Sequence, residues 1–146
     1  MPAMTQSLED YIEAVYVIAS EADCGEACVG DVARLLKVKM PSVVKALHEL
    51  KKLELVIQKP YSGIRLTAKG ARVAKTVLNR HTLLREFLVS LGVGRRTADR
   101  DACLMEHILS AETIDRIRIY TQNKKQSNDE KSDQHLAPVA GTGAYS

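Results

Sequence analysis

The sequence predicts a mostly α-helical chain in which three short helices and a small β-hairpin come first and further helices follow. Apolar residues recur at three- and four-residue steps over most of residues 7–122, which is the period of helices packed on one face. Residues 53–66 differ, because short extended runs flank the turn residues Pro60 and Gly63, as in a hairpin. Aromatic residues make up only 4% of the chain, so the core is expected to be aliphatic.

The length of 146 residues suits one ordinary domain or two small ones, and 45% of the residues are apolar. No apolar run approaches the ~18 residues of a membrane span. The acidic N-terminus does not resemble a signal peptide. We therefore expect a cytoplasmic protein with no membrane partner, and its three cysteines do not predict a disulfide framework there.

Charge is distributed unevenly along the chain. Residues 1–28 hold six acidic residues and no Lys or Arg, whereas residues 29–72 hold ten basic and three acidic residues. The overall net charge is only +3. A basic middle between acidic and nearly neutral flanks indicates a local surface that binds a polyanion.

The first predicted helix covers residues 7–21. Asp10 and Glu13 lie one turn apart on the face opposite its apolar residues. Such a pair is most often exposed to solvent, but it can also supply hard oxygen ligands to a metal ion. The loop that follows contains Cys24 and Cys28, which we interpret as ordinary loop thiols, since a zinc site needs four ligands.

Two short helices over residues 29–38 and 41–52 predict a helix-turn-helix. Pro41 suits the first turn of the second helix. The apolar residues that we expect this helix to bury are Val43, Val44, Leu47 and Leu50. With the hairpin over residues 53–66, the order is that of a winged helix, whose second helix enters the major groove while the wing lies along the backbone.

The basic residues of this region support DNA binding. They gather in the second helix, its turn and the wing, and a short side chain such as Ser42 or a long donor such as Lys45 can reach base edges or phosphates. The residues predicted to contact DNA are Lys39, Pro41, Ser42, Lys45, Tyr61 and Arg65.

The second half predicts three more helices. A long helix runs from Thr67 to about Leu91 and carries His81, a position more typical of a packed core histidine than of a ligand. In the next helix, over residues 95–109, Cys103, Glu106 and His107 fall on one face. They offer three first-row-metal donors, although an ordinary polar face fits this stretch alone as well. Ser110 is expected to cap a last helix, which ends near Gln122.

The remaining residues 123–146 are polar and aperiodic, and we predict a mostly disordered tail. The predicted domains are therefore residues 1–72, a winged helix-turn-helix, and residues 73–122, a helical domain.

Several motifs in order resemble the diphtheria-toxin-repressor family of metal-dependent transcriptional repressors, and more closely its short manganese-transport-regulator branch. The motifs are Ser7-Leu8-Glu9-Asp10-Tyr11-Ile12-Glu13-Ala14-Val15-Tyr16, Pro41-Ser42-Val43-Val44-Lys45, Tyr61-Ser62-Gly63-Ile64-Arg65-Leu66-Thr67, Arg80-His81-x-Leu83-Leu84, Glu106-His107-x-Leu109-Ser110 and Ile114-Asp115-Arg116-Ile117. The resemblance covers roughly residues 6–118.

The resemblance implies a homodimer that binds a double-stranded DNA operator and controls metal-transport genes, with residues 73–122 as its metal-binding and dimerisation domain. The metal ligands that it implies are Asp10, Glu13, His81, Cys103, Glu106 and His107. Oxygen ligands suit Mn²⁺, and the Cys103 thiolate raises the affinity for Fe²⁺, Co²⁺ and Zn²⁺. We therefore expect Mn²⁺ or Fe²⁺, with Zn²⁺ or Co²⁺ possible. Arg85 and Asp99 stand where the iron branch has an ancillary site, which we expect to be damaged or absent.

Three other functions would account for part of the sequence. A thiol-responsive winged-helix regulator would use Cys24, Cys28 or Cys103 without sensing a metal. A small metallohydrolase would leave the basic helix-turn-helix unexplained, and no nucleophile stands apart from the proposed ligands, so we do not expect an enzyme. An architectural DNA-binding protein would need no ligand.

Overall fold

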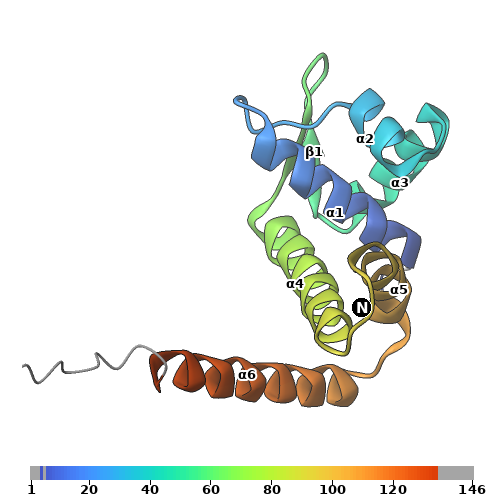
Figure 1. Cartoon of the computed structure of the whole chain (residues 1–146). Coiled ribbons are helices and arrows are strands. Elements are labelled where there is room, and N and C mark those ends of the chain that lie inside the picture. The colour runs from blue at the N-terminus through green and yellow to red at the C-terminus, as the bar shows by residue number, and fades with distance from the viewer. Residues whose placement is uncertain (1–3, 5, 135–146) are drawn as a thin grey trace, which may run out of the picture. The chain divides into compact units, whose positions relative to one another are not determined.

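The computed structural model describes residue 4 and residues 6–134, and it confirms a mostly α-helical chain with a small wing (Figure 1). The elements of this part are α1 (Gln6–Glu21), α2 (Val29–Leu36), α3 (Met40–Lys52), β1 (Val56–Gln58), β2 (Ile64–Leu66), α4 (Ala68–Ser90), α5 (Arg95–Ile108) and α6 (Ala111–Gln134). The chain divides into two compact units within α4, between Thr82 and Leu83. The predicted domain boundary after residue 72 stays a prediction.

The turn between α2 and α3 is tight because α2 ends in a left-handed residue. Lys37 has a φ of 56°, and the N–H of Val38 donates to the carbonyl of Ala33 at 3.0 Å. This bond satisfies a carbonyl at the helix end that has no partner inside the helix. Helix α3 then begins within three residues, with Pro41 in its first turn, as the sequence predicted.

The wing is an antiparallel pair in which Ile57 lies opposite Arg65. Its first strand begins at Val56, so the extended run is shorter than the predicted one from Leu53. Leu53 instead caps α3, and Glu54 reverses the chain with a φ of 59°. The loop before α2 joins the wing through Ala27, which exchanges two backbone hydrogen bonds with Ile64 at 2.9 and 2.8 Å.

The first unit has an aliphatic core shared by α1, α2, α3 and the wing. Fully buried side chains from successive elements meet there: Ile12, Val15, Val32, Val43, Leu50 and Ile64. Burial of side chains of this kind is the main stabilising contribution to such a unit. The prediction that Val44 is buried is wrong, because its side chain is 56% exposed. Val43 already fills the core, and the next residue of a helix points about 100° away.

The start of α4 is held against the end of α3. The N–H of Gly70 donates to Thr67 Oγ1 at 3.0 Å, and the same hydroxyl donates to the carbonyl of Glu54 at 2.7 Å. A Cβ atom on Gly70 would lie 1.9 Å from the Leu55 carbonyl oxygen, so glycine permits this approach. Further along, Arg80 Nη2 donates to Glu9 Oε1 at 3.4 Å, which joins α4 to α1 within the first unit.

The second unit has a smaller core, formed by the end of α4 with α5 and α6. Leu84, Ala102 and Ile114 are its buried residues. Ser110 caps α6 as predicted, since its hydroxyl accepts a hydrogen bond from the N–H of Thr113 at 3.2 Å. The ring centroids of Phe87 and Tyr120 lie 5.9 Å apart in an edge-to-face arrangement.

Helix α6 is longer than the sequence predicted. It continues past Gln122 to Gln134, so residues 123–134 are helical rather than disordered. Neither Pro nor Gly interrupts them, and Lys125 Nζ pairs with Glu86 Oε2 at 2.8 Å, which ties this stretch to α4. The rest of the predicted tail, residues 135–146, lies outside the described residues. Among the helices described, none is long and apolar enough to cross a membrane.

Candidate metal centre and DNA-binding surface

Helix α5 buries an acidic side chain while two of its large apolar side chains are exposed. Glu106 is 1% exposed, whereas Leu104 is 57% and Ile108 is 76% exposed. His107 Nε2 lies 3.2 Å from Glu106 Oε1, and its side chain is also nearly covered. A buried carboxylate is costly unless positive charge or hydrogen bonds compensate it. Glu106 and His107 are therefore covered while Cys103, on the same side of α5, is exposed, and the sequence pattern alone did not decide this.

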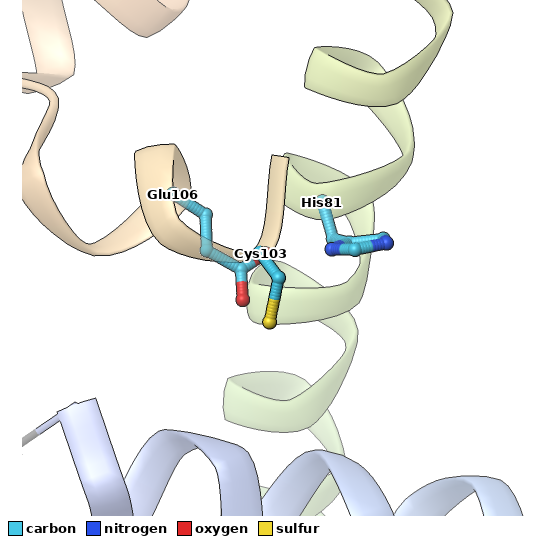
Figure 2. Close-up of side chains that lie close together, drawn as sticks. All are labelled: His81, Cys103 and Glu106. Atoms are coloured by element: carbon cyan, nitrogen blue, oxygen red, sulfur yellow. The ribbon is translucent and has the colours of Figure 1, made fainter. Parts of the chain in front are cut away.

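Three different donors converge beside Glu106. One ligand atom each of His81, Cys103 and Glu106 lies within 4.8 Å of the others. Figure 2 shows the Cys103 thiol and the Glu106 carboxylate projecting from α5 in the same direction, next to the His81 ring on α4. His81 comes directly before the point where α4 enters the second unit, and Leu83 and Leu84 of the same helix pack in the α5–α6 core.

This arrangement fits a divalent transition metal. Metal–ligand distances of about 2.0 to 2.3 Å place two ligands of one ion roughly 3 to 4 Å apart, and the three donor atoms already lie within 4.8 Å of one another. Imidazole, thiolate and carboxylate are all ligands of first-row metals. The buried carboxylate supplies a reason for a cation at this place, since burial strengthens its interaction with a charge.

The two acids of α1 lie in the first unit, one turn apart and both partly buried. Asp10 and Glu13 are therefore less exposed than acids on an arbitrary surface helix. Their helix is anchored by Ile12 and Val15, which are fully buried in the winged-helix core. A metal ion bound by Asp10 and Glu13 would therefore be attached to the core of the first unit through α1.

The predicted DNA-contacting residues of α3 form an exposed surface. Lys39 caps the helix, and Pro41, Ser42 and Lys45 follow with exposed side chains. Val44 lies among them, and an exposed apolar side chain in that position can contact the methyl group of thymine. Tyr61 is fully exposed at the end of the wing, where the chain turns with a φ of 61°.

Arg65 differs from the other predicted DNA contacts because it has an internal partner. Its Nε donates to Glu26 Oε1 at 2.7 Å. This hydrogen bond, together with one from the Gly63 N–H, lowers the pKa of the Glu26 carboxyl, and the carboxylate in turn raises the pKa of Arg65. Nothing in the sequence pattern pointed to Glu26 as a partner of the wing. The contact joins residues 39 apart in the chain, so no local pattern could have revealed it.

The two positions expected to disable an ancillary site pair with each other. Arg85 Nη1 lies 3.4 Å from Asp99 Oδ1. A guanidinium repels a divalent cation and already neutralises the nearby carboxylate. This pair therefore does not form a second metal site of the kind that uses acidic or imidazole side chains.

Comparison with known families and proteins agrees with this geometry. Residues 3–64 match the iron dependent repressor N-terminal DNA binding domain, and residues 67–134 match the iron dependent repressor metal binding and dimerisation domain. An uncharacterised HTH-type transcriptional regulator of Methanocaldococcus jannaschii is 37% identical over 84% of this chain and 98% of its own. The HTH-type transcriptional regulator MntR of Bacillus subtilis is 39% identical over 88% of this chain and 89% of its own.

Solved structures are similar in fold as well. A manganese-dependent transcriptional repressor in complex with manganese superposes with a TM-score of 0.70 at 25% identity, covering 79% of this chain and 52% of its own. The T. acidophilum IdeR structure gives a TM-score of 0.63 at 28% identity, covering 80% of this chain and 54% of its own. The chain therefore belongs to the iron-dependent repressor family, the diphtheria-toxin-repressor family of metal-dependent transcriptional repressors that its motifs resemble.

Proposed function

We propose that this protein is a homodimeric, cytoplasmic repressor that senses Mn²⁺ or Fe²⁺, binds an operator in double-stranded DNA and controls metal-transport genes. The observation that carries the proposal is the buried carboxylate of Glu106 grouped with the His81 and Cys103 donors. A helix that served only for packing would turn Leu104 and Ile108 inward and leave Glu106 exposed. The relatives called MntR and the manganese-bound repressor structure favour manganese.

The proposed ligand set combines His81, Cys103, Glu106 and His107 with Asp10 and Glu13 of α1. When bound, a divalent cation supplies the positive charge that offsets the carboxylates. Without it, three acids that share one site repel one another. Since α1 is anchored in the winged-helix core, ligands from α1 and α5 together restrict how the DNA-binding unit is oriented. The bound metal ion shifts the population of protein conformations and does not catalyse a reaction. We propose no enzymatic activity.

The proposed DNA contacts are Lys39 at the N-cap of α3, Pro41, Ser42 and Lys45 within α3, and Tyr61 of the wing. Residues 1–72 would then bind DNA, while residues 73–122 bind metal and dimerise. A dimer would place two α3 helices in successive major grooves, about 34 Å apart. Metal-dependent repression requires that the bound metal favours dimer conformations with this distance between the two α3 helices.

The test is operator binding by anaerobically purified protein, measured by fluorescence anisotropy with Mn²⁺, Fe²⁺, Co²⁺, Zn²⁺ or a chelator. We expect tight binding with one or more metals and weak binding with chelator. The operator can be selected from random DNA in the presence of Mn²⁺. Equal affinity in all conditions would rule out metal sensing. The Cys103→Ser variant tests the thiol-sensor alternative: a retained metal response together with a lost response to oxidant would favour that alternative.

A further inference from the structure

One carboxylate in the loop before α2 holds the base of the wing. Glu26 Oε2 accepts the backbone N–H of Gly63 at 3.1 Å, and Glu26 Oε1 accepts Arg65 Nε at 2.7 Å and Ser62 Oγ at 3.5 Å. All three donors belong to the last turn of the hairpin and to β2. The Glu26 side chain is only 21% exposed, which is low for an acid in a surface loop.

The backbone makes the same connection at closer range. Ala27 exchanges two hydrogen bonds with Ile64. The loop residue after Glu26 therefore forms an antiparallel β-bridge to strand β2 of the wing. A Cβ atom on Gly63 would lie 2.7 Å from Glu26 Cβ and 3.2 Å from the Ala27 carbonyl oxygen. The loop and the wing therefore approach as closely as a glycine permits.

Electrostatics alone would not place an acid here. The wing belongs to the basic stretch of the chain, and a carboxylate next to a DNA-binding surface opposes the phosphates. Glu26 also engages Arg65, which could otherwise bind a phosphate. The Glu26 carboxylate weakens the general attraction of the protein to DNA. Its presence is explained if it improves the geometry of the remaining contacts with phosphates, because phosphate contacts set the register and orientation of a protein on DNA.

We propose that Glu26 is a positioning residue for DNA recognition, which fixes the base of the wing so that its exposed tip, Lys59–Tyr61, meets the DNA backbone in one orientation. The proposal rests on the DNA-binding function proposed above. It assigns Arg65 an internal role, as the partner of Glu26. Residue 26 lies outside both α3 and the hairpin, so it acts through the wing and not by contact with DNA.

The test compares Glu26→Gln with a matched control, Glu49→Gln. Glu49 is an exposed acid of α3 whose partner is Lys52 at 3.2 Å, so both variants remove one negative charge from the same unit. Three quantities are measured: affinity for operator DNA with metal bound, affinity for metal, and the hydrogen-exchange rates of the Gly63 and Ile64 amides without DNA. Gly63→Ala disturbs the same contact from the wing side and serves as a second variant.

We expect Glu26→Gln to weaken operator binding about tenfold although it makes the protein more positive, because a fixed contact geometry is lost. The control is expected to bind equally well or up to about twofold more tightly, as charge alone predicts. Metal affinity stays unchanged in both. The amides of residues 63 and 64 exchange faster in Glu26→Gln and in Gly63→Ala, but not in the control.

The proposal is overturned if Glu26→Gln binds DNA as tightly as the control, or if its wing amides exchange at the wild-type rate. Failure of the proposed function gives a different result: the wild-type protein would then show no metal-dependent DNA binding. In that case the exchange rates, which need neither DNA nor metal, still decide whether Glu26 holds the wing.

Discussion

The two units of this chain bury different kinds of side chain. The winged-helix unit has an ordinary aliphatic interior, with Ile12, Leu50 and Ile64 fully buried. The second unit has a small apolar core, a buried carboxylate at Glu106 and exposed apolar residues along α5. The first unit is thus stabilised by its own residues. The second unit combines a buried carboxylate with exposed apolar side chains, a combination that the proposed metal binding and dimerisation would explain.

The largest expected effect tests this contrast with one chemical change in two places. Leu50→Ala should destabilise the protein by about 2 to 5 kcal/mol, because it leaves a cavity in a well-packed core. Leu104→Ala, at an exposed position of α5, should change the stability of the monomer by less than about 0.5 kcal/mol. Chemical denaturation followed by circular dichroism measures both. Similar losses in the two variants would show that the second unit is packed like the first.

Removal of the buried charge should have the next largest effect. Glu106→Gln should weaken metal binding about a hundredfold, since it replaces a charged ligand in a covered site, and Mn²⁺ should no longer raise the melting temperature. Glu112→Gln, at the exposed start of α6, is the control and should bind metal normally. Isothermal titration and thermal melts provide the measurements. An unchanged affinity in Glu106→Gln would exclude Glu106 as a ligand.

The exposed apolar residues of α5 should matter for assembly. Ile108→Lys should weaken self-association at least about tenfold, because a charge replaces an apolar side chain at an interface. Ile57→Lys makes the same change at a 50% exposed position of the wing and should leave the dimer intact. Sedimentation equilibrium distinguishes the two. A monomeric Ile57→Lys protein and a dimeric Ile108→Lys protein would place the interface on the first unit instead.

The thiol should affect the choice of metal more than the strength of binding. Cys103→Asp replaces a soft ligand with a hard one and should lower the affinity for Zn²⁺ relative to Mn²⁺ by about tenfold. Competition titrations with a chromophoric chelator give this ratio. An unchanged ratio would mean that Cys103 does not bind the ion.

The smallest expected effect is the pH dependence of the wing. The pKa of Glu26 is lowered from its usual value of 4.5, first because Arg65 donates to it. Because the pKa is lowered in the folded state, the contact contributes its full stability at pH values above the unfolded-state pKa. This stability is lost as the pH falls through the lower pKa of the folded state. Between about pH 5 and pH 8 the relative protection of the Gly63 amide, corrected for intrinsic exchange, should stay constant, and it should decline towards pH 4. A decline that begins near neutral pH would point to another titrating group.

Much of the molecule follows from local pattern. The tight turn after α2, the start of α3 near Pro41, the Ser110 cap and the long helix that carries His81 agree with the sequence expectations. The misjudged positions have local causes too. Val44 is exposed because a neighbouring residue already fills the core, and residues 123–134 are helical because polar composition alone does not prevent a helix without Pro or Gly.

The sequence by itself determined which donors lie on one side of α5, since Cys103, Glu106 and His107 are within two turns of one helix and share its period. Only the tertiary structure decided that Glu106 and His107 are covered while Cys103 is exposed, and that His81, more than twenty positions earlier, lies beside Cys103 and Glu106. The same holds for Glu26 and the wing. Helical periodicity relates residues a few positions apart, whereas burial and long-range pairing depend on which elements pack together, and that is settled by the free energy of the whole fold.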